Sequence, residues 1–564
     1  MPHNRRERDL ALERRTGQYV VRQRESKIYS YIPPEKKENK KKKDEGGFNA
    51  VDLVYVFIKF LLFAAAALLT AFLVFKAYPK SSVSAFVWVA FVPFLAALRK
   101  TKTFKGSVSF GVMTGFFTCG GLFYWIYYTC MAGGVTPQLS LLALAGLSLI
   151  ISLQFALFSG LSFYIRKTGI AFIFFAATGW VTVEFFHQIL AYKILGFPWF
   201  MLGYSQWNRP EFLQFAAYGG VYAVSFIIVL VNASLAVALT VNDFVKRFVA
   251  VFIAFTIFFG AFIFGKQVLD IREPEDFTSI RVALLQPNID LYKKWDAAFE
   301  HEIEDRLTEL ITYSAQSNPD LIVWPESALP GPIEHEYYGD FAINLAKMSK
   351  AYQVVGSNRE GADGKQYVSA FLVNPAGEFK GIYDKETLVP FGEYVPLQHR
   401  LENLGVDLGV VGQMGVFTKG SDEQPLLEFK GIKFGTTICY ESIFHKTWMR
   451  AAEEDARFFV NITNDGWYLD TSAPYQHFAV NVVRAVEYGK PVIRSANTGI
   501  SAVIDGKGRI LQASELNTAA VVEYELPLYD EEPTFYTHWG DIFSYICMVV
   551  FLTCALAGFV ISNE

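Results

Sequence analysis

Residues 51–75 read VDLVYVFIKFLLFAAAALLTAFLVF, and the charged side chains in this stretch are Asp52 and Lys59. A helix rises about 1.5 Å per residue, so roughly 20 apolar residues cross a bilayer core about 30 Å thick. Comparable apolar runs recur along the chain. They predict membrane spans near residues 51–75, 81–98, 106–133, 139–165, 169–191, 217–241, 248–265 and 541–561.

The composition of the whole chain excludes several other classes of protein. Of 564 residues, 52% are hydrophobic and 19% are charged, and the mean hydropathy is +0.24. Soluble domains average about 25% charged residues, so a row of soluble domains is excluded. The 52 Phe, 29 Tyr and 10 Trp exclude a disordered or fibrous chain. A net charge of −4 gives no indication of nucleic acid as a partner.

Basic residues in the connecting loops predict the topology, because Lys and Arg accumulate on the cytoplasmic side. The loop after the third span, residues 133–140, carries no charge. The exits of the second, fourth and sixth spans carry Arg99, Lys100, Lys102, Lys105, Arg166, Lys167, Lys246 and Arg247. This pattern predicts a cytoplasmic N-terminus, an extracytoplasmic segment over residues 266–540 and a cytoplasmic C-terminus.

Four segments follow from these patterns. Residues 1–47 are rich in Lys and Arg, without the apolar stretch and cleavage site of a signal peptide, and read as a cytoplasmic arm that fixes topology or binds anionic lipid headgroups. Residues 48–268 form the membrane domain with spans 1 to 7. Residues 269–538 form an extracytoplasmic domain, and residues 539–564 carry span 8.

The extracytoplasmic segment alternates strand-like and helix-like stretches. Helical patterns cover residues 299–317 and 475–488. Short runs rich in β-branched and apolar residues occur at 280–285, 321–324, 352–355, 434–438 and 458–461. Such alternation is typical of an α/β domain. Glycine-rich phosphate loops of the Walker or Rossmann type are absent from the sequence.

Cys439 is the candidate nucleophile of this domain. The other four cysteines fall within predicted spans, so a disulfide inside the domain is impossible. A single thiol in an oxidising compartment is either buried and inert or kept for its reactivity. Cys439 follows a predicted strand over residues 432–438, and a strand end that turns sharply exposes its side chain to a crevice.

Two further residues are candidate partners of Cys439, whereas the histidines of the domain show no pattern that nominates one. Glu326 follows the apolar strand Leu321-Ile-Val-Trp324 and suits a general base. Lys385 lies in a loop with Pro390 and Pro396 that reads as rigid. A fixed ammonium there is expected to lower the thiol pKa and to stabilise an oxyanion.

Two features of the membrane domain also stand out. Glu184 is an acid inside a span, which indicates either a functional site or a side chain hydrogen-bonded to a neighbouring helix. Residues 196–206 form an aromatic, uncharged loop between spans 5 and 6. Because Trp and Tyr favour the headgroup level, this loop is predicted to lie on the outer interface.

Together, Trp324-Pro-Glu326, Asp384-Lys385 and Ile438-Cys439-Tyr-Glu441 resemble the Glu-Lys-Cys triad of the nitrilase superfamily. The chain resembles in particular the apolipoprotein N-acyltransferases of bacterial envelopes, over about residues 50–562. Further segments similar to that family are 196–199, 203–206, 286–288, 294–296, 388–393, 464–467, 476–478 and 494–500. The resemblance implies an α-β-β-α sandwich joined to a polytopic helical domain of about eight spans, with no cofactor or metal.

The resemblance also implies a reaction and a place in the cell. Cys439 would take an acyl chain from a phospholipid, phosphatidylethanolamine in our expectation, and pass it to the α-amine of an S-diacylglyceryl cysteine on an apolipoprotein. Glu326 would move protons and Lys385 would hold the oxyanion. Supporting positions in the family match Glu393, Tyr440, Glu441, Trp295 and Asn464, although Trp295 also suits a buried packing residue. The implied location is the bacterial inner membrane, with a periplasmic catalytic domain.

Two other functions stay open at this point. A membrane-tethered amidase would use the same thioester with water as acceptor. A transporter or scaffold with an inert outer domain would form no covalent adduct at Cys439.

Overall fold

We describe the protein from a computed structural model, which describes residues 50–294, 296–396, 417–530 and 532–563. The chain forms two compact units, residues 1–59 and 60–564. In the first unit, the described residues are the beginning of helix α2 (Ala50–Ala77). The predicted basic arm, residues 1–47, lies outside the described residues.

Six helices within the described ranges are long and apolar enough to cross a membrane. They are α2, α7 (Pro137–Ile165), α8 (Ala171–Leu190), α10 (Ala216–Thr240), α11 (Phe244–Leu269) and α18 (Ile542–Asn563), and they coincide with six of the predicted spans. A seventh candidate is the pair α5 (Phe104–Leu122) and α6 (Trp125–Ala132), which meet at 51°. The prediction of a polytopic helical domain is confirmed.

The span predicted over residues 81–98 is a shorter, broken helix. It consists of η2 (Ser84–Phe86), α3 (Val87–Ala90) and α4 (Val92–Leu98). Pro93 in the first turn of α4 has no N–H to donate, which favours a break before it. At the break, the Phe91 N–H donates to Asn232 Oδ1 (2.8 Å) and Asn232 Nδ2 donates to the Val87 oxygen (2.9 Å). A polar side chain of α10 thus satisfies backbone groups that lipid cannot.

The polar part of the chain contains two six-stranded sheets. The first has the order β12-β1-β2-β3-β4-β5, and the second has the order β11-β10-β9-β8-β7-β6. The first sheet comprises β1 (Phe277–Gln286), β2 (Leu321–Val323), β3 (Tyr352–Glu360), β4 (Gln366–Val373), β5 (Phe379–Asp384) and β12 (Ala520–Tyr529). The second comprises β6 (Leu427–Phe429), β7 (Ile432–Ile438), β8 (Phe458–Thr463), β9 (Val492–Ala496), β10 (Ala502–Ile504) and β11 (Ile510–Ala513).

Strand β1 shows how the layers arise from the sequence. Val282 and Leu284 belong to a core cluster that also holds β8 of the second sheet, whereas Ala283 and Leu285 pack with α12 (Glu300–Ala315) and α13 (Glu336–Ser349). Side chains alternate along a strand, so a run that is apolar at every position is buried on both faces.

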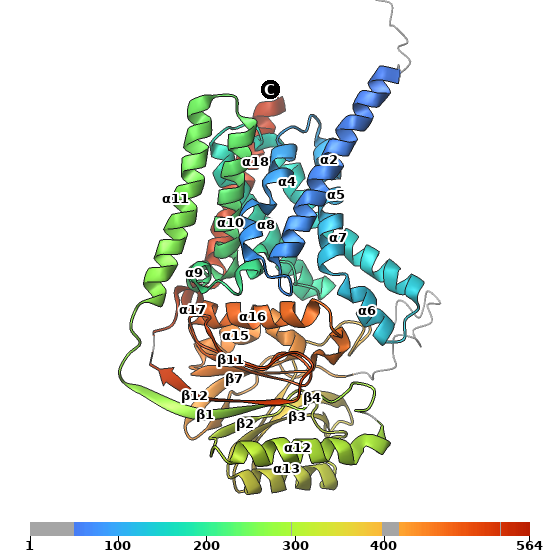
Figure 1. Cartoon of the computed structure of the whole chain (residues 1–564), viewed down its shortest axis with the longest axis vertical. Coiled ribbons are helices and arrows are strands. Elements are labelled where there is room, and N and C mark those ends of the chain that lie inside the picture. Colours follow the sequence, from blue (N-terminus) through green and yellow to red (C-terminus); the bar gives the residue numbers. More distant parts are fainter. Residues whose placement is uncertain (1–49, 295, 397–416, 531, 564) are drawn as a thin grey trace, which may run out of the picture. The chain divides into compact units, whose positions relative to one another are not determined.

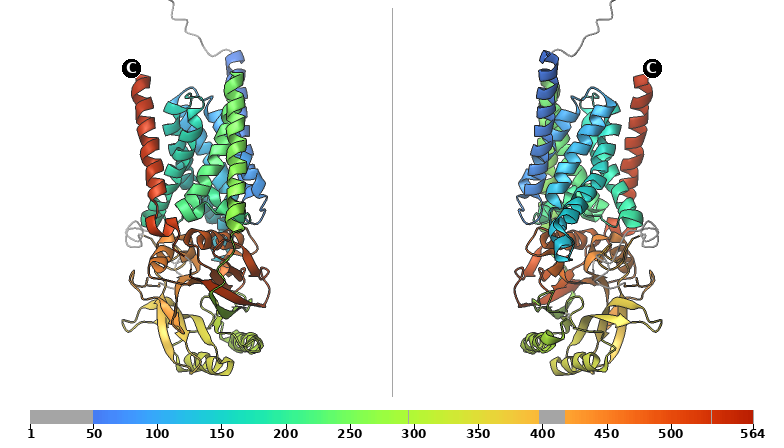
Figure 2. Two further views of the ribbon diagram at one scale, coloured as in Figure 1. Left: turned by 90° about the vertical axis from the view of Figure 1, so that its left-hand side faces the viewer. Right: turned by 90° about the vertical axis from the view of Figure 1, so that its right-hand side faces the viewer.

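The second sheet is covered by α15 (His445–Glu453) and α16 (Ala473–Tyr488), and the result is the expected α-β-β-α sandwich (Figure 1). In both views of Figure 2, the yellow-green helices α12 and α13 lie at the end of the sandwich away from the membrane helices. On the other side, α16 contacts α10. The predicted fold class is confirmed.

Candidate active site

Cys439 lies at the point where strand β7 ends and the chain turns. It is the first residue of the 3₁₀ turn η6 (Cys439–Ile443), and its backbone φ is +52°. A positive φ is unusual for a residue other than glycine and marks a sharp, strained turn of the kind that carries nucleophiles. The residue is only 6% exposed. The predicted strand end is therefore present, and the thiol is almost completely buried.

Glu326 follows strand β2 and lies close enough to Cys439 for its charge to act on the thiol. One carboxylate oxygen, Oε1, accepts a hydrogen bond from Lys385 Nζ at 2.9 Å. The other, Oε2, accepts one from the Asn464 N–H at 2.9 Å. The backbone oxygen of Glu326 accepts from Lys294 Nζ at 3.3 Å. Glu326 is thus fixed at both carboxylate oxygens and at its peptide group, a placement that suits a general base.

Lys385 links two carboxylates in the interior. Its side chain is fully buried, and its Nζ lies 2.9 Å from Glu326 Oε1 and 2.6 Å from Glu393 Oε1. Glu393 also accepts from the Val389 N–H at 2.9 Å through its other oxygen. Burial by itself would lower the pKa of Lys385, but the charges of Glu326 and Glu393 outweigh it and raise the pKa well above its ordinary value. Lys385 is therefore a permanent ammonium.

Opposing effects set the pKa of the Cys439 thiol. The charge of Lys385 lowers this pKa, in the direction that the sequence predicts. Burial and the charge of Glu326 act more strongly, and together they raise the pKa of Cys439 well above its ordinary value. The thiol is therefore protonated at rest, and a nucleophilic role would need a base to take its proton.

Glu441 fastens the turn that follows Cys439. Its Oε2 accepts from the Ile438 N–H at 2.7 Å, and its Oε1 accepts from the N–H groups of Glu386 and, at 2.9 Å, of Thr387. Burial raises the pKa of Glu441 to about 8, although the Ile438 and Thr387 donors act to lower it. These bonds join the turn η6, which begins at Cys439 and is called the nucleophile turn below, to the loop that carries Lys385.

The other predicted supporting residues differ in their placement. Asn464 contributes through its backbone N–H, which binds Glu326, while its side-chain oxygen accepts from Gly466 N at 3.2 Å. Tyr440 is buried, and its ring centroid lies 6.4 Å from that of Trp199 in the membrane domain. Trp295 lies outside the described residues.

A buried polar network behind Cys439 was not recognised from the sequence. His477 Nε2 lies 3.0 Å from the Cys439 backbone oxygen, and His477 Nδ1 lies 2.8 Å from Asp465 Oδ1. Arg494 Nη2 pairs with Asp465 Oδ2 at 2.7 Å. Burial would raise the pKa of Asp465, but Arg494 and His477 lower it to about 2. The sequence signal for this network is that its residues lie in the family-like segments 464–467, 476–478 and 494–500, which by themselves assign no role.

The aromatic loop 196–206 is largely buried against other parts of the protein, with residues 198–206 all buried. Trp199 is 3% exposed, and its ring lies 5.8 Å from His477 between centroids. Glu184, fully buried, holds this loop: its Oε1 accepts from the Leu202 N–H at 2.7 Å and from Trp180 Nε1 at 2.8 Å. Glu184 thus has hydrogen-bond partners both in this loop and in its own helix α8.

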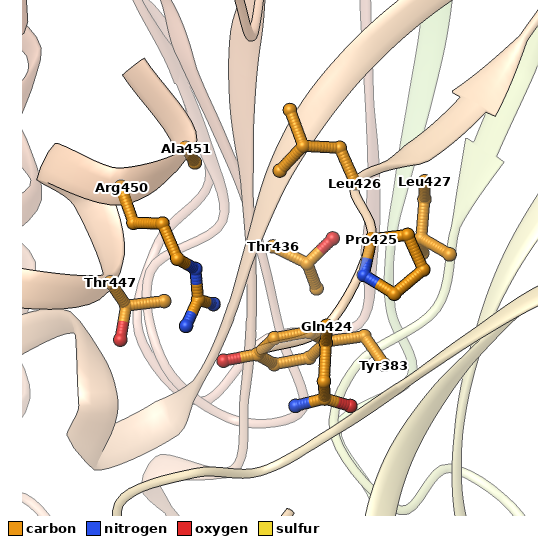
Figure 3. A pocket seen from close by; sticks show the side chains of 9 residues that line it. All are labelled: Tyr383, Gln424, Pro425, Leu426, Leu427, Thr436, Thr447, Arg450 and Ala451. Atoms are coloured by element: carbon orange, nitrogen blue, oxygen red, sulfur yellow. The ribbon is translucent and has the colours of Figure 1, made fainter. Parts of the chain in front are cut away.

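A small cavity lies beside the site (Figure 3). The described residues around it are Tyr383, Gln424, Pro425, Leu426, Leu427, Thr436, Thr447, Arg450 and Ala451. The Tyr383 hydroxyl contacts both carboxylate oxygens of Glu441, at 3.3 and 3.2 Å. Because neither Cys439 nor Lys385 is among these residues, the cavity is separate from the place where an acyl group would sit.

Two family matches divide the chain as the fold does. Residues 281–534 match the family described as Carbon-nitrogen hydrolase. Residues 57–234 match the family described as Apolipoprotein N-acyltransferase N-terminal domain.

The two relatives described next are similar over most of the chain, and both are apolipoprotein N-acyltransferases. An apolipoprotein N-acyltransferase of Geobacter metallireducens is 34% identical over 499 residues, which cover 86% of this chain and 92% of that protein. One of Rickettsia bellii is 30% identical over 468 residues, which cover 80% and 89%. Among solved structures, Saccharomyces cerevisiae Nit3, a member of branch 10 of the nitrilase superfamily, is 20% identical with a TM-score of 0.35, and the match covers 45% of this chain and 90% of that one.

Proposed function

The chain belongs to the apolipoprotein N-acyltransferase family, and from this premise we propose how its residues perform the transfer. Membership of this family indicates that the protein is an acyltransferase of a bacterial inner membrane and acts on lipoproteins. The observation that carries the proposal is the convergence of three buried groups: the thiol of Cys439, the carboxylate of Glu326 and the ammonium of Lys385.

In the first half-reaction, the Cys439 sulfur attacks an ester carbonyl of a phospholipid and Glu326 accepts the thiol proton. The carbonyl oxygen becomes an oxyanion, which the Lys385 ammonium and backbone N–H groups stabilise. When the tetrahedral intermediate collapses, the C–O bond breaks and Glu326 returns the proton to the departing oxygen. A lysophospholipid leaves, and the acyl chain stays on Cys439 as a thioester.

In the second half-reaction, the α-amine of an S-diacylglyceryl cysteine attacks the thioester carbon. Glu326 takes a proton from the amine, the C–S bond breaks, and the Cys439 thiol is restored with that proton. The raised pKa of Cys439 favours the resting thiol in both halves. Two transfers through one sulfur require ping-pong kinetics.

The membrane helices fit these substrates. Both the donor and the acceptor are anchored in a bilayer, so a catalytic domain held at its surface meets them by lateral diffusion. We place that domain on the periplasmic side and both termini in the cytoplasm, because the loops after the second, fourth and sixth predicted spans are basic. We propose phosphatidylethanolamine as the donor.

The deciding experiment is covalent trapping. Purified protein in detergent micelles is incubated with phosphatidylethanolamine carrying a labelled acyl chain, without acceptor, and the label on Cys439 is measured before and after hydroxylamine. We expect a hydroxylamine-sensitive acyl adduct that is absent in Cys439→Ala. When a diacylglyceryl peptide is then added, we expect the acyl chain to move from Cys439 to the peptide amine as an amide. An adduct that persists in Cys439→Ala would contradict the proposal.

The same assay separates the two other functions. A membrane-tethered amidase would release free fatty acid from the adduct at equal rates with and without the diacylglyceryl peptide. A transporter or scaffold with an inert outer domain would form no adduct. Glu326→Gln is expected to fold and to insert normally, and to form no adduct because the thiol keeps its proton.

A further inference from the structure

Helix α16 lies between the nucleophile turn η6 and the membrane helices. Its polar side chains fall into two sets by spacing. Gln476 and Glu487 are eleven residues apart, about three turns, and so share one face; His477 and Arg484 are seven apart, about two turns, and share another. All four side chains are buried.

The first set binds membrane helices at the points where these helices are broken. Between α5 and α6, Gln476 Nε2 donates to the Leu122 oxygen at 3.1 Å, and Gln476 Oε1 accepts from Trp125 Nε1 at 3.2 Å. A break in a membrane helix leaves backbone groups without partners, and here a side chain of the catalytic domain supplies them.

Helix α10 shows the same arrangement. It is interrupted at Gly219 and Gly220, where the φ of Gly220 is +63°, and it resumes at Val221. The Val221 N–H, which the break releases, donates to Glu487 Oε1 at 2.7 Å. A carboxylate at the start of the resumed helix is also favoured by the helix dipole.

The second set holds the turn that carries the nucleophile. His477 Nε2 lies 3.0 Å from the backbone oxygen of Cys439. Arg484 donates to the Ile443 oxygen at 2.6 Å and to the Ser442 oxygen at 3.4 Å, the last carbonyls of the turn. Arg484 also pairs with Glu487 on the same helix. The two sets are thus joined by a buried ion pair.

We propose that α16 is a positioning helix, which fixes the Cys439 turn relative to the broken membrane helices and thereby sets the thiol for attack on a membrane lipid. This inference rests on the proposed function, since it assigns the four residues a role in the same acylation step. None of them needs to touch substrate; they act through the backbone of the turn. A displacement of the reacting atoms by about 1 Å can slow a reaction by about a hundredfold.

The test measures single-turnover acylation of Cys439 by labelled phosphatidylethanolamine in micelles, over a range of lipid concentrations. Gln476→Leu removes a membrane-side attachment, and Arg484→Lys keeps the positive charge while it loses the forked contact with two carbonyls. For both variants we expect the maximal acylation rate to fall by about 10- to 100-fold, with the half-saturating lipid concentration unchanged. Lys507→Met is the matched control, because Lys507 pairs with Glu273 at 2.8 Å without contacting the turn.

Each outcome decides between alternatives. A folded Gln476→Leu or Arg484→Lys with the wild-type maximal rate overturns the inference. An equal fall of the maximal acylation rate in Lys507→Met also overturns it, because that would indicate a general loosening of the fold. A change only in the half-saturating lipid concentration overturns it as well, because that would indicate a role in substrate binding. If Gln476→Leu is recovered only as aggregate, Glu487→Gln replaces it as the membrane-side variant, with the same expectations. Failure of the proposed function is distinguishable, because the wild type itself would then form no adduct.

Discussion

Substitution Lys385→Met tests the electrostatic centre of the site. In the wild type one ammonium lies within 2.9 Å of a carboxylate oxygen of Glu326 and within 2.6 Å of one of Glu393. Methionine has a similar length and no charge. The variant therefore leaves two buried carboxylates without their cation, and breaking a buried pair in this way is strongly destabilising.

Protonation limits the size of the loss. Like charges that share a buried site raise the pKa of one carboxyl, here Glu393, whose pKa burial already raises above its ordinary value of 4.5. Keeping a carboxyl protonated costs about 1.36 kcal/mol for each pH unit above its unfolded value. Keeping Glu393 protonated therefore costs at most about 4 kcal/mol at pH 7.5 and at most about 1 kcal/mol at pH 5.5. A raised carboxyl pKa favours the folded state at low pH, so the variant gains stability as the pH falls toward 4.5.

The assay is thermal unfolding in detergent micelles at pH 5.5 and 7.5, together with acyl-adduct formation. We expect Lys385→Met to unfold at a lower temperature than the wild type at pH 7.5, to recover most of the difference at pH 5.5, and to form no adduct at either pH. Lys430→Met is the control, because its pair with Asp320 is at the surface and worth about 1 kcal/mol or less. The reasoning would be refuted if Lys385→Met unfolded at the same lowered temperature, relative to the wild type, at both pH values. Acyl-adduct formation by Lys385→Met at the wild-type level would also refute it.

Three further substitutions have defined outcomes. Glu184→Gln should keep the two hydrogen bonds at Oε1 and unfold like the wild type, whereas Glu184→Ala should lower stability by about 2–4 kcal/mol, measured by thermal unfolding in micelles. Asp465 has a pKa lowered to about 2, so its charge stabilises the fold above pH 3.8. The wild type should lose roughly 2 kcal/mol progressively between about pH 5 and pH 1, and Asp465→Asn should lack this acid transition. In Gly220→Ala, the added Cβ would lie 2.8 Å from the Tyr536 ring at a φ of +63°, so we expect a lower unfolding temperature and slower acylation.

The membrane helices illustrate what hydropathy predicts well. Six predicted spans match long apolar helices, because length and apolarity are local properties of the sequence. The break at Phe91 depends instead on Asn232, more than a hundred residues away, which supplies its hydrogen bonds. The burial of loop 196–206 likewise depends on partners from other segments, such as Glu184 and His477. Composition alone does not predict this burial, since aromatic residues suit both a headgroup layer and a packed interior.

By itself, the sequence determined the two-part architecture, the family resemblance and the residues Glu326, Lys385 and Cys439 as candidates, because apolar runs and short motifs are written in neighbouring residues. Only the tertiary structure decided that Lys385 joins Glu326 and Glu393, that burial keeps Cys439 protonated, and that α16 connects the nucleophile turn to two broken helices. These properties depend on distance and desolvation between groups far apart in the chain. Such quantities exist only once the chain is folded.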